Sequence, residues 1–207
     1  MIKLTSASGF TIAELMIATS IFSLVLLVGA AAFIGLGKSY YKGYTLTQTQ
    51  ETAKQIINDV SSNIRLSSSV SGGSSSGGRA YYCVGSHRYT YILYREVNGS
   101  NHDNSSNFGL LQDEPNGDGC GDPFGSPGVA FVKPAELLAN HMRLLAFSIN
   151  PVGSNGAYSI QLTVASGSDD SLTDPNSATA QCKNQVSGNR FCAVTTLTSV
   201  VHQGVSV

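Results

Sequence analysis

A long apolar run dominates the first quarter of the sequence. The 22 residues from Leu15 to Leu36 contain no Asp, Glu, Lys or Arg. At a helical rise of about 1.5 Å per residue, a helix of this length crosses a hydrocarbon layer about 30 Å thick. A cleavable secretory signal is the alternative, but such a signal has a basic segment and then an apolar core of only about 7 to 15 residues. Since Lys3 is the only basic residue ahead of the run, the pattern favours a transmembrane helix.

The helical pattern continues beyond the apolar run as an amphipathic stripe. Apolar and small residues recur at steps of three and four, with polar residues between them; the stripe consists of Leu46, Thr49, Ala53, Ile57, Val60 and Ile64. No proline interrupts residues 11–66, which at helical rise is a length of roughly 84 Å. We therefore expect one helix with a membrane half over 10–37 and an amphipathic half over 38–66.

After the helix the sequence predicts a linker and then a β-rich domain. The Ser/Gly-rich tract at 67–79 has the composition of a flexible linker, and beyond it the hydrophobic period changes to near two over residues 80–207. The strands predicted from aromatic and β-branched residues are Arg88–Val97, Leu144–Ile149, Tyr158–Ala165 and Phe191–Val201. Turn residues between Ile149 and Tyr158 predict that the second and third of these form an antiparallel hairpin. A short helix is expected over Pro134–Met142. The fold class is α+β, with a long N-terminal helix packed on an antiparallel sheet.

Composition and cysteine usage indicate an extracytoplasmic chain. Twelve Lys and Arg residues against thirteen Asp and Glu residues leave no basic field for nucleic acid. Only 12% of residues are charged, as in many secreted β-rich proteins. Four cysteines with no C-x-x-C pair favour two disulfides over a zinc or redox site. Proximity along the chain favours Cys182 with Cys192, which leaves Cys83 for Cys120.

Acidic residues crowd a turn-rich segment around Cys120, and Asp113, Asp118 and Asp122 are its candidate calcium ligands. The alternative is a solvated loop tethered by the disulfide, and no other cofactor is expected. The four histidines show no H-E-x-x-H spacing, and the sequence has no Walker or dinucleotide glycine pattern. We do not expect an enzyme.

The most informative segment is Gly9-Phe10-Thr11-Ile12-Ala13-Glu14, directly ahead of the apolar run. A carboxylate within a membrane helix costs about 2.5–3.5 kcal/mol at the helix centre and less near the interface, so Glu14 requires a partner. This segment resembles the class III signal sequence of type IV pilins and pseudopilins. The resemblance implies a leader peptide at 1–9, cleavage by prepilin peptidase between Gly9 and Phe10, and N-methylation of Phe10.

The same resemblance implies how the subunit is stored and assembled. Thr11 and Glu14 become assembly residues, because the amine freed at Phe10 supplies a positive partner for the carboxylate of Glu14. The partners implied are other pilin subunits, prepilin peptidase, the pilus assembly platform of the inner membrane, and membrane lipid. The chain is then a single-pass protein of the inner membrane until it joins an extracytoplasmic filament.

Three functions remain open at this point. The stretch from Tyr44 to Arg65 is similar to minor pilins of the PilW type and to J-type pseudopilins, which favours a minor subunit of a type IV pilus. A pseudopilin of type II secretion or DNA uptake is the second reading. A membrane-tethered adhesin or binding module outside any filament is the third.

Overall fold

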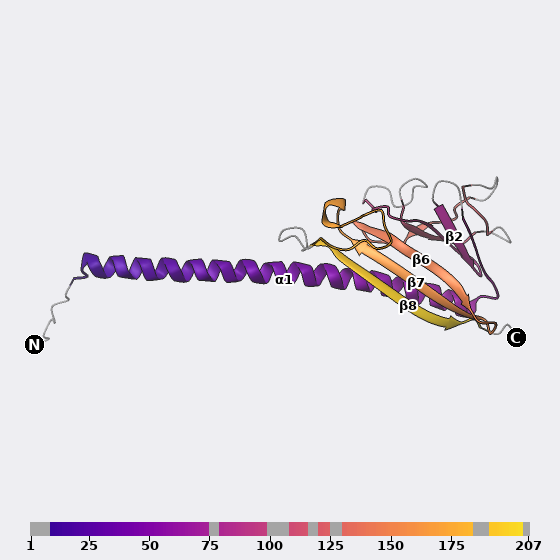
Figure 1. The fold of residues 1–207 in the computed structure, drawn as a ribbon, viewed down its shortest axis with the longest axis horizontal. Helices are drawn as coiled ribbons and strands as arrows, with labels where there is room; N and C mark the ends of the chain where they lie inside the picture. The colour runs from indigo at the N-terminus through magenta and orange to yellow at the C-terminus, as the bar shows by residue number, and fades with distance from the viewer. Residues whose placement is uncertain are drawn as a thin grey trace, which may run out of the picture. The chain divides into compact units, whose positions relative to one another are not determined.

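The computed structural model describes residues 9–74, 79–98, 108–115, 120–124, 130–183 and 191–204. These residues form one long helix, α1 (Ile12–Leu66), and eight strands. The chain divides into two compact units, residues 1–40 and residues 41–207. Within the second unit the end of α1 packs against antiparallel sheets (Figure 1), an α+β arrangement consistent with the pilin-like fold.

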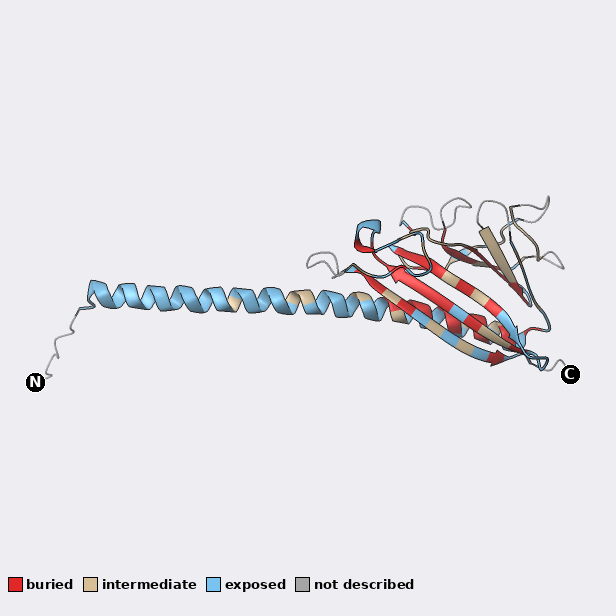
Figure 2. Ribbon diagram, viewed as in Figure 1, coloured by how far each residue is buried: buried red, intermediate tan, exposed pale blue. Residues whose placement is uncertain are grey.

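The helix begins two residues after the predicted start at position 10 and ends at the predicted position 66. Its residues up to position 40 are almost entirely exposed in the single chain, whereas one face of its last five turns is buried (Figure 2). The buried residues of α1 are Thr49, Thr52, Ala53, Ile56, Ile57, Val60, Ser61 and Ile64. The predicted stripe is thus confirmed except at Leu46, which is 39% exposed.

Strands β1 to β5 form one sheet in sequence order, and every neighbouring pair is antiparallel. Their bounds are β1 (Val70–Ser74), β2 (Arg79–Val84), β3 (His87–Ile92), β4 (Leu110–Asp113) and β5 (Ala135–Glu136). The strand predicted over Arg88–Val97 ends earlier, because β3 gives way to a turn in which Tyr94 has a φ of +65°.

The second sheet contains β6 (Met142–Val152), β7 (Ala157–Ser166) and β8 (Ala193–His202), in that order. The predicted hairpin is confirmed, since β6 and β7 pair antiparallel from Met142↔Ser166 to Val152↔Ala157. Gly153 and Gly156 close it with φ values of +68° and +66°, which glycine adopts readily. A short 3₁₀ turn, η1 (Asp169–Ser171), follows β7.

The core lies where α1 meets side chains of both sheets. Ile56, Val60 and Ile64 of α1 join the cluster with Tyr89 of the first sheet and Phe147 of the second. The rings of Tyr89 and Phe147 meet edge to face with centroids 6.5 Å apart, a favourable aromatic geometry. The amphipathic half of the helix is therefore the element around which the domain is built.

The linker prediction over 67–79 is wrong for residues 70–74, which form the edge strand β1. A Cβ at Gly72 would lie 2.7 Å from a ring carbon of Tyr82, and one at Gly73 would lie 2.7 Å from the hydroxyl of Tyr81. The tyrosine rings of β2 occupy the space that side chains on β1 would fill, a known way to stabilise glycines in an edge strand. Glycine serves close approach here and not flexibility.

The short helix predicted over Pro134–Met142 is also wrong, since Ala135–Glu136 forms strand β5. The carboxylate of Glu136 accepts hydrogen bonds from the backbone N–H groups of Gly109, Leu110 and Leu138 at 2.8–3.0 Å. Of these three amides only that of Leu138 lies in the predicted helix, and its N–H donates to the Glu136 side chain and not to a helical carbonyl. Lys133 and His141 at the two ends of the segment have positive φ values, which a helix does not accommodate.

Candidate functional site

The start of α1 is organised by a reciprocal pair of side chains, Thr11 and Glu14. The backbone N–H and the hydroxyl of Thr11 both donate to Oε2 of Glu14, at 2.9 and 2.8 Å. In return the backbone N–H of Glu14 donates to the Thr11 hydroxyl oxygen at 3.2 Å. This is a capping box, in which two N–H groups left over at the helix start are satisfied by side chains.

The capping box sets the direction of the Glu14 side chain. Because the carboxylate reaches back to Thr11, it lies toward the N-terminal end of the helix, next to Phe10. Gly9 and Phe10 precede the helix and are exposed, Phe10 to 80%. No described atom lies within 4 Å of a Cβ built on Gly9, so the fold itself places no demand for glycine at this position.

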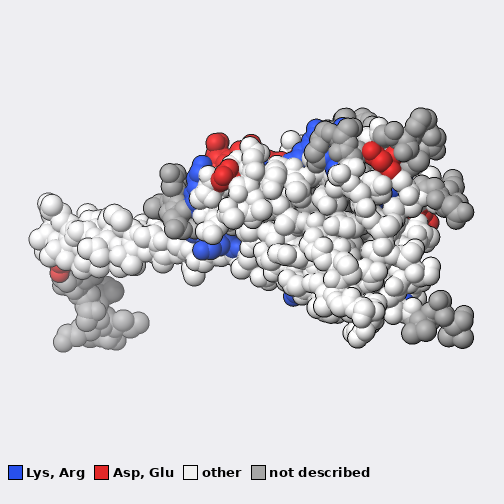
Figure 3. Space-filling view, turned by 45° about the vertical axis from the view of Figure 1, so that its right-hand side comes forward, with Lys and Arg blue, Asp and Glu red and all other residues white. Residues whose placement is uncertain are grey.

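The helix that follows has the length and composition of a membrane span. It is the one helix in the described part of the chain that is long and apolar enough to cross a membrane. Its large apolar side chains are more than half exposed in the single chain; they include Leu15, Phe22, Leu27, Phe33 and Leu36. In Figure 3 this segment is free of basic and acidic atoms except for one red group near its N-terminal end. A surface this apolar requires lipid or protein around it.

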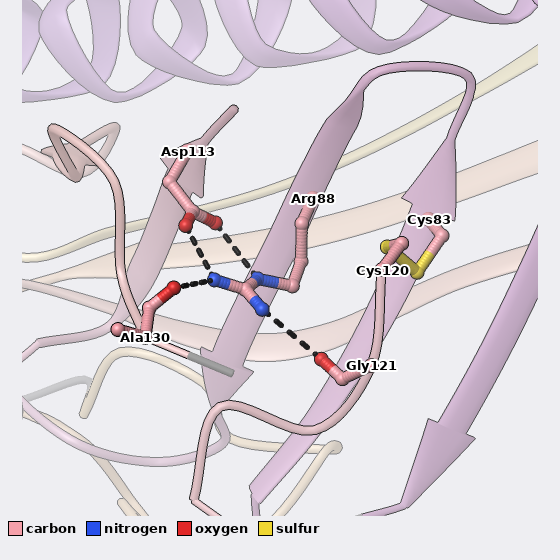
Figure 4. Close-up of a disulfide and its surroundings, with 6 residues drawn as sticks. All are labelled: Cys83, Arg88, Asp113, Cys120, Gly121 and Ala130. Atoms are coloured by element: carbon pink, nitrogen blue, oxygen red, sulfur yellow. Dashed lines mark hydrogen bonds and ion pairs between the residues drawn. A yellow bond between two sulfur atoms is a disulfide. The ribbon is translucent and has the colours of Figure 1, made fainter. Parts of the chain in front are cut away.

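The two calcium candidates that the structure describes, Asp113 and Asp122, are engaged in other contacts. Asp113 is buried and pairs with Arg88 of β3, whose Nε donates to Oδ1 at 2.9 Å and whose Nη2 donates to Oδ2 at 2.5 Å (Figure 4). Asp122 accepts a hydrogen bond from the N–H of Phe124 at 2.9 Å, and Asp118 lies outside the described residues. Across the ranges that the structure describes, no group of three or more His, Cys, Asp or Glu side chains is placed to hold a metal.

Arg88 instead connects the loops around the first disulfide. Two further N–H groups of Arg88 donate to the carbonyls of Gly121 and Ala130 at 3.1 and 2.9 Å, and Figure 4 shows these bonds beside the Cys83–Cys120 disulfide. The second disulfide joins Cys182 to Cys192, the pair that proximity along the chain favours, and the first is the pair that this choice leaves over. Sequence reasoning missed Arg88 and Asp113 as a pair, because 25 residues separate them.

A second buried arginine lies at the start of β6. Arg143 donates to Glu96 at 3.1 Å and to the carbonyl of Gly167 at 3.1 Å, and it lies 2.5 Å from a carboxylate oxygen of Asp169. Glu96 also contacts the ring of His141 at 2.9 Å. The signal in the sequence was a charged residue at the head of an otherwise apolar strand, a position where a charge needs a partner.

Two cavities lie near the charged clusters around Arg88 and Arg143. A polar one of about 390 Å³ is lined by His87, Gln112, Glu114 and Lys133. A more apolar one of about 480 Å³ lies in the second unit between α1 and the loops that follow β7 and precede β6 and β8, and Tyr41, Tyr44, His141 and Phe191 are among its lining residues. Neither was expected from sequence.

Comparisons with known proteins add no relative: no family model matches the chain, no curated protein matches it, and no solved structure matches it.

Proposed function

We propose that this chain is a structural subunit, of the minor type, of a type IV pilus or pilus-like filament. It is made with a leader at 1–9, cleaved after Gly9, methylated on Phe10 and assembled through its N-terminal helix. Function here is assembly and not catalysis.

One observation carries the proposal: the segment from Gly9 to Glu14 stands directly ahead of an apolar helix whose side chains are exposed in the single chain. The resemblance requires three things at once: the order of Gly9, Phe10 and Glu14, their spacing, and the apolar run that follows them. The amphipathic half of α1, covered by a disulfide-bonded β domain, supports the same assignment.

The capping box gives Glu14 a defined part in assembly. Both hydrogen bonds from Thr11 end on Oε2, which leaves Oε1 placed to accept from a further donor. In the processed subunit that donor is the amine of Phe10, from the same chain or from a neighbour in the filament. An ion pair of this kind offsets the cost of a carboxylate at membrane depth.

Two substitutions test processing and assembly separately. Gly9→Val blocks cleavage, because the requirement for glycine comes from the peptidase and not from the fold. Glu14→Val leaves a processed subunit that fails to enter filaments. Glu51→Val is the matched control, since Glu51 is an exposed carboxylate on the same helix outside the apolar run.

The readouts are the N-terminal mass of the membrane-extracted chain and its amount in sheared filaments. Incorporation of the Glu14→Val variant at the level of the Glu51→Val control would contradict the assembly mechanism. Retention of Met1 in the unmodified chain would support the tethered binding module instead.

A further inference from the structure

Strand β8 forms one edge of the second sheet (Figure 1). It pairs with β7 along its whole length, and among the described residues it pairs with no other strand. At ten residues it is almost twice as long as an average strand. The side of β8 that faces away from β7 is therefore a long sheet edge.

One hydrogen bond identifies which residues of β8 face this edge. The N–H of Gln203 donates to the carbonyl of Gly156 at 2.9 Å, and this pair continues the β7–β8 register, in which His202 lies opposite Ala157. Residues that bond to a given neighbour alternate with residues that do not along an antiparallel strand. The odd-numbered residues of β8 thus bond to β7. The residues whose N–H and C=O groups point away from β7 are Val194, Thr196, Thr198, Val200 and His202.

These outward backbone groups lack a protein partner. In the described part of the chain, no backbone or side-chain group forms a hydrogen bond with the outward N–H and C=O groups of β8. Several of the residues that carry them are also exposed, including Thr198 and Val200. Backbone donors and acceptors bind water or another polar group when the fold gives them no partner, so the edge is free to accept a ligand.

Strand β8 carries none of the features that usually prevent pairing at an edge. Natural edge strands are blocked by short length, charged side chains, proline or a bulge. The β8 sequence contains no Asp, Glu, Lys, Arg or Pro, and its ladder with β7 has no shift in register. The outer side of β6, by contrast, accepts backbone hydrogen bonds from Tyr94 and Val97, and β5 is only two residues long.

The spacing of the outward groups indicates what can bind there. Donors and acceptors recur every second residue, which is about 6.8 Å at strand rise. An extended polypeptide presents donors and acceptors at the same repeat, and addition of such a strand to an open edge is a common mode of peptide recognition. Since β8 has no charged side chain apart from the ionisable His202 at its end, the edge favours an uncharged segment.

The direction of β8 argues against a second copy as the occupant. Phe191, just before β8, lies 5.8 Å from Tyr41 between ring centroids, and the N–H of Gly204, just after β8, donates to the carbonyl of Arg65. The strand therefore runs in the same direction as the end of α1. Antiparallel pairing of two β8 strands would point their helices in opposite directions, which two chains anchored in one membrane cannot adopt. Parallel pairing is the less stable pattern.

We propose that the outer edge of β8 binds an extended, uncharged segment of another polypeptide, which adds a fourth strand to the second sheet. The exclusion of a second copy rests on the membrane anchoring of the proposed function. The open edge itself does not, and its test involves neither cleavage nor filaments, so the two proposals can fail separately.

The probe is a fluorescein-labelled peptide with the sequence of residues 157–166, because this sequence forms an uninterrupted ladder with β8. Its binding to the full-length chain in detergent micelles is measured by fluorescence anisotropy. The control peptide has proline in place of residues 161 and 162, so that each of its two edges lacks a donor. Thr198→Pro removes one outward N–H and no bond to β7, a position at which an edge strand tolerates proline. Thr198→Ala is the matched control, because it retains that N–H.

We expect the peptide to bind the unmodified chain and Thr198→Ala equally. Binding to Thr198→Pro should be about tenfold weaker, because a hydrogen bond is lost and the proline ring projects toward the added strand. The control peptide should not bind. Equal affinity for the two Thr198 variants, or no binding of the probe to the unmodified chain, would overturn the proposal.

Amide hydrogen exchange of the unmodified chain, resolved by residue, gives a second readout that does not depend on how Thr198→Pro folds. The probe should slow exchange at the outward amides of β8, whereas the odd-numbered amides are protected with and without it. Outward amides that are already protected in the dilute chain alone would show that the chain covers its own edge. Protection that increases with the concentration of the chain alone would assign the edge to a second copy. Either result would overturn the proposal.

Discussion

Replacement of Arg88 by methionine is expected to destabilise the β domain strongly. The Arg88 and Asp113 side chains both have 0% exposure, so Arg88→Met leaves a buried carboxylate whose remaining donor is the N–H of Val132 at 3.1 Å. Removal of one partner from a buried ion pair costs about 3–5 kcal/mol. The loss is a large share of the roughly 5–15 kcal/mol that stabilises a typical domain.

The assay is urea unfolding of the full-length chain in detergent micelles, followed by the near-ultraviolet circular dichroism of its tyrosines. Lys54→Met is the control, since Lys54 is an exposed cation on α1 and its replacement should change the free energy of unfolding by less than about 0.5 kcal/mol. The double variant Arg88→Met with Asp113→Asn should recover much of the loss, because it removes the unpaired charge. An Arg88→Met variant as stable as the Lys54→Met control would refute the reasoning.

Three further effects follow from burial, chain connectivity and ionisation. Ile64→Ala leaves a gap at a fully buried position of α1 and should lower the free energy of unfolding by about 2–5 kcal/mol. Leu66→Ala is the control, because Leu66 is 84% exposed and its replacement should leave stability nearly unchanged. Equal losses of stability in the two variants would show that the helix end is not packed as described. Removal of the Cys83–Cys120 disulfide should lower the free energy of unfolding by about 1 kcal/mol more than removal of Cys182–Cys192. The reason is the longer loop that the first disulfide closes, with separations of 37 and 10 residues. Urea unfolding of the two variants, each with both cysteines replaced by serine, measures the difference. Burial and the hydrogen bond to Asp59 raise the pKa of the Tyr89 phenol, so the stability that the neutral phenol contributes is present below the unfolded pKa of about 10 and is lost as pH rises above it. Stability of the Tyr89→Phe variant should therefore fall less steeply at alkaline pH than that of the unmodified chain. An unchanged slope would contradict the assignment.

The parts of the fold that follow from local pattern were predictable. The apolar run and the stripe that continues it specify α1, because the run is long enough to form a membrane helix and the stripe repeats at the helical period without a proline in between. The β6–β7 hairpin follows from alternation flanking Gly153 and Gly156. The linker prediction failed because it rested on local composition. Glycines at positions 72 and 73 indicate flexibility when the segment is considered by itself, but they form a strand in the structure because the rings of Tyr81 and Tyr82 lie over them.

In the candidate site, too, contacts between residues close in sequence were predictable and contacts between distant residues were not. Thr11 and Glu14 are three residues apart, the spacing of a capping box, so their pairing could have been predicted from sequence. Arg88 with Asp113 and Arg143 with Glu96 are separated by 25 and 47 residues, and only the folded chain brings them together. The aromatic cavity likewise combines α1 with a loop near the C-terminus, which no local pattern encodes.

The most direct test of the filament assignment is the mass of the N-terminal peptide of this chain, measured on material from membranes and from sheared filaments. We expect a peptide that begins at methylated Phe10 in both fractions. A chain that retains Met1, or one that is cleaved but never found in filaments, would contradict it.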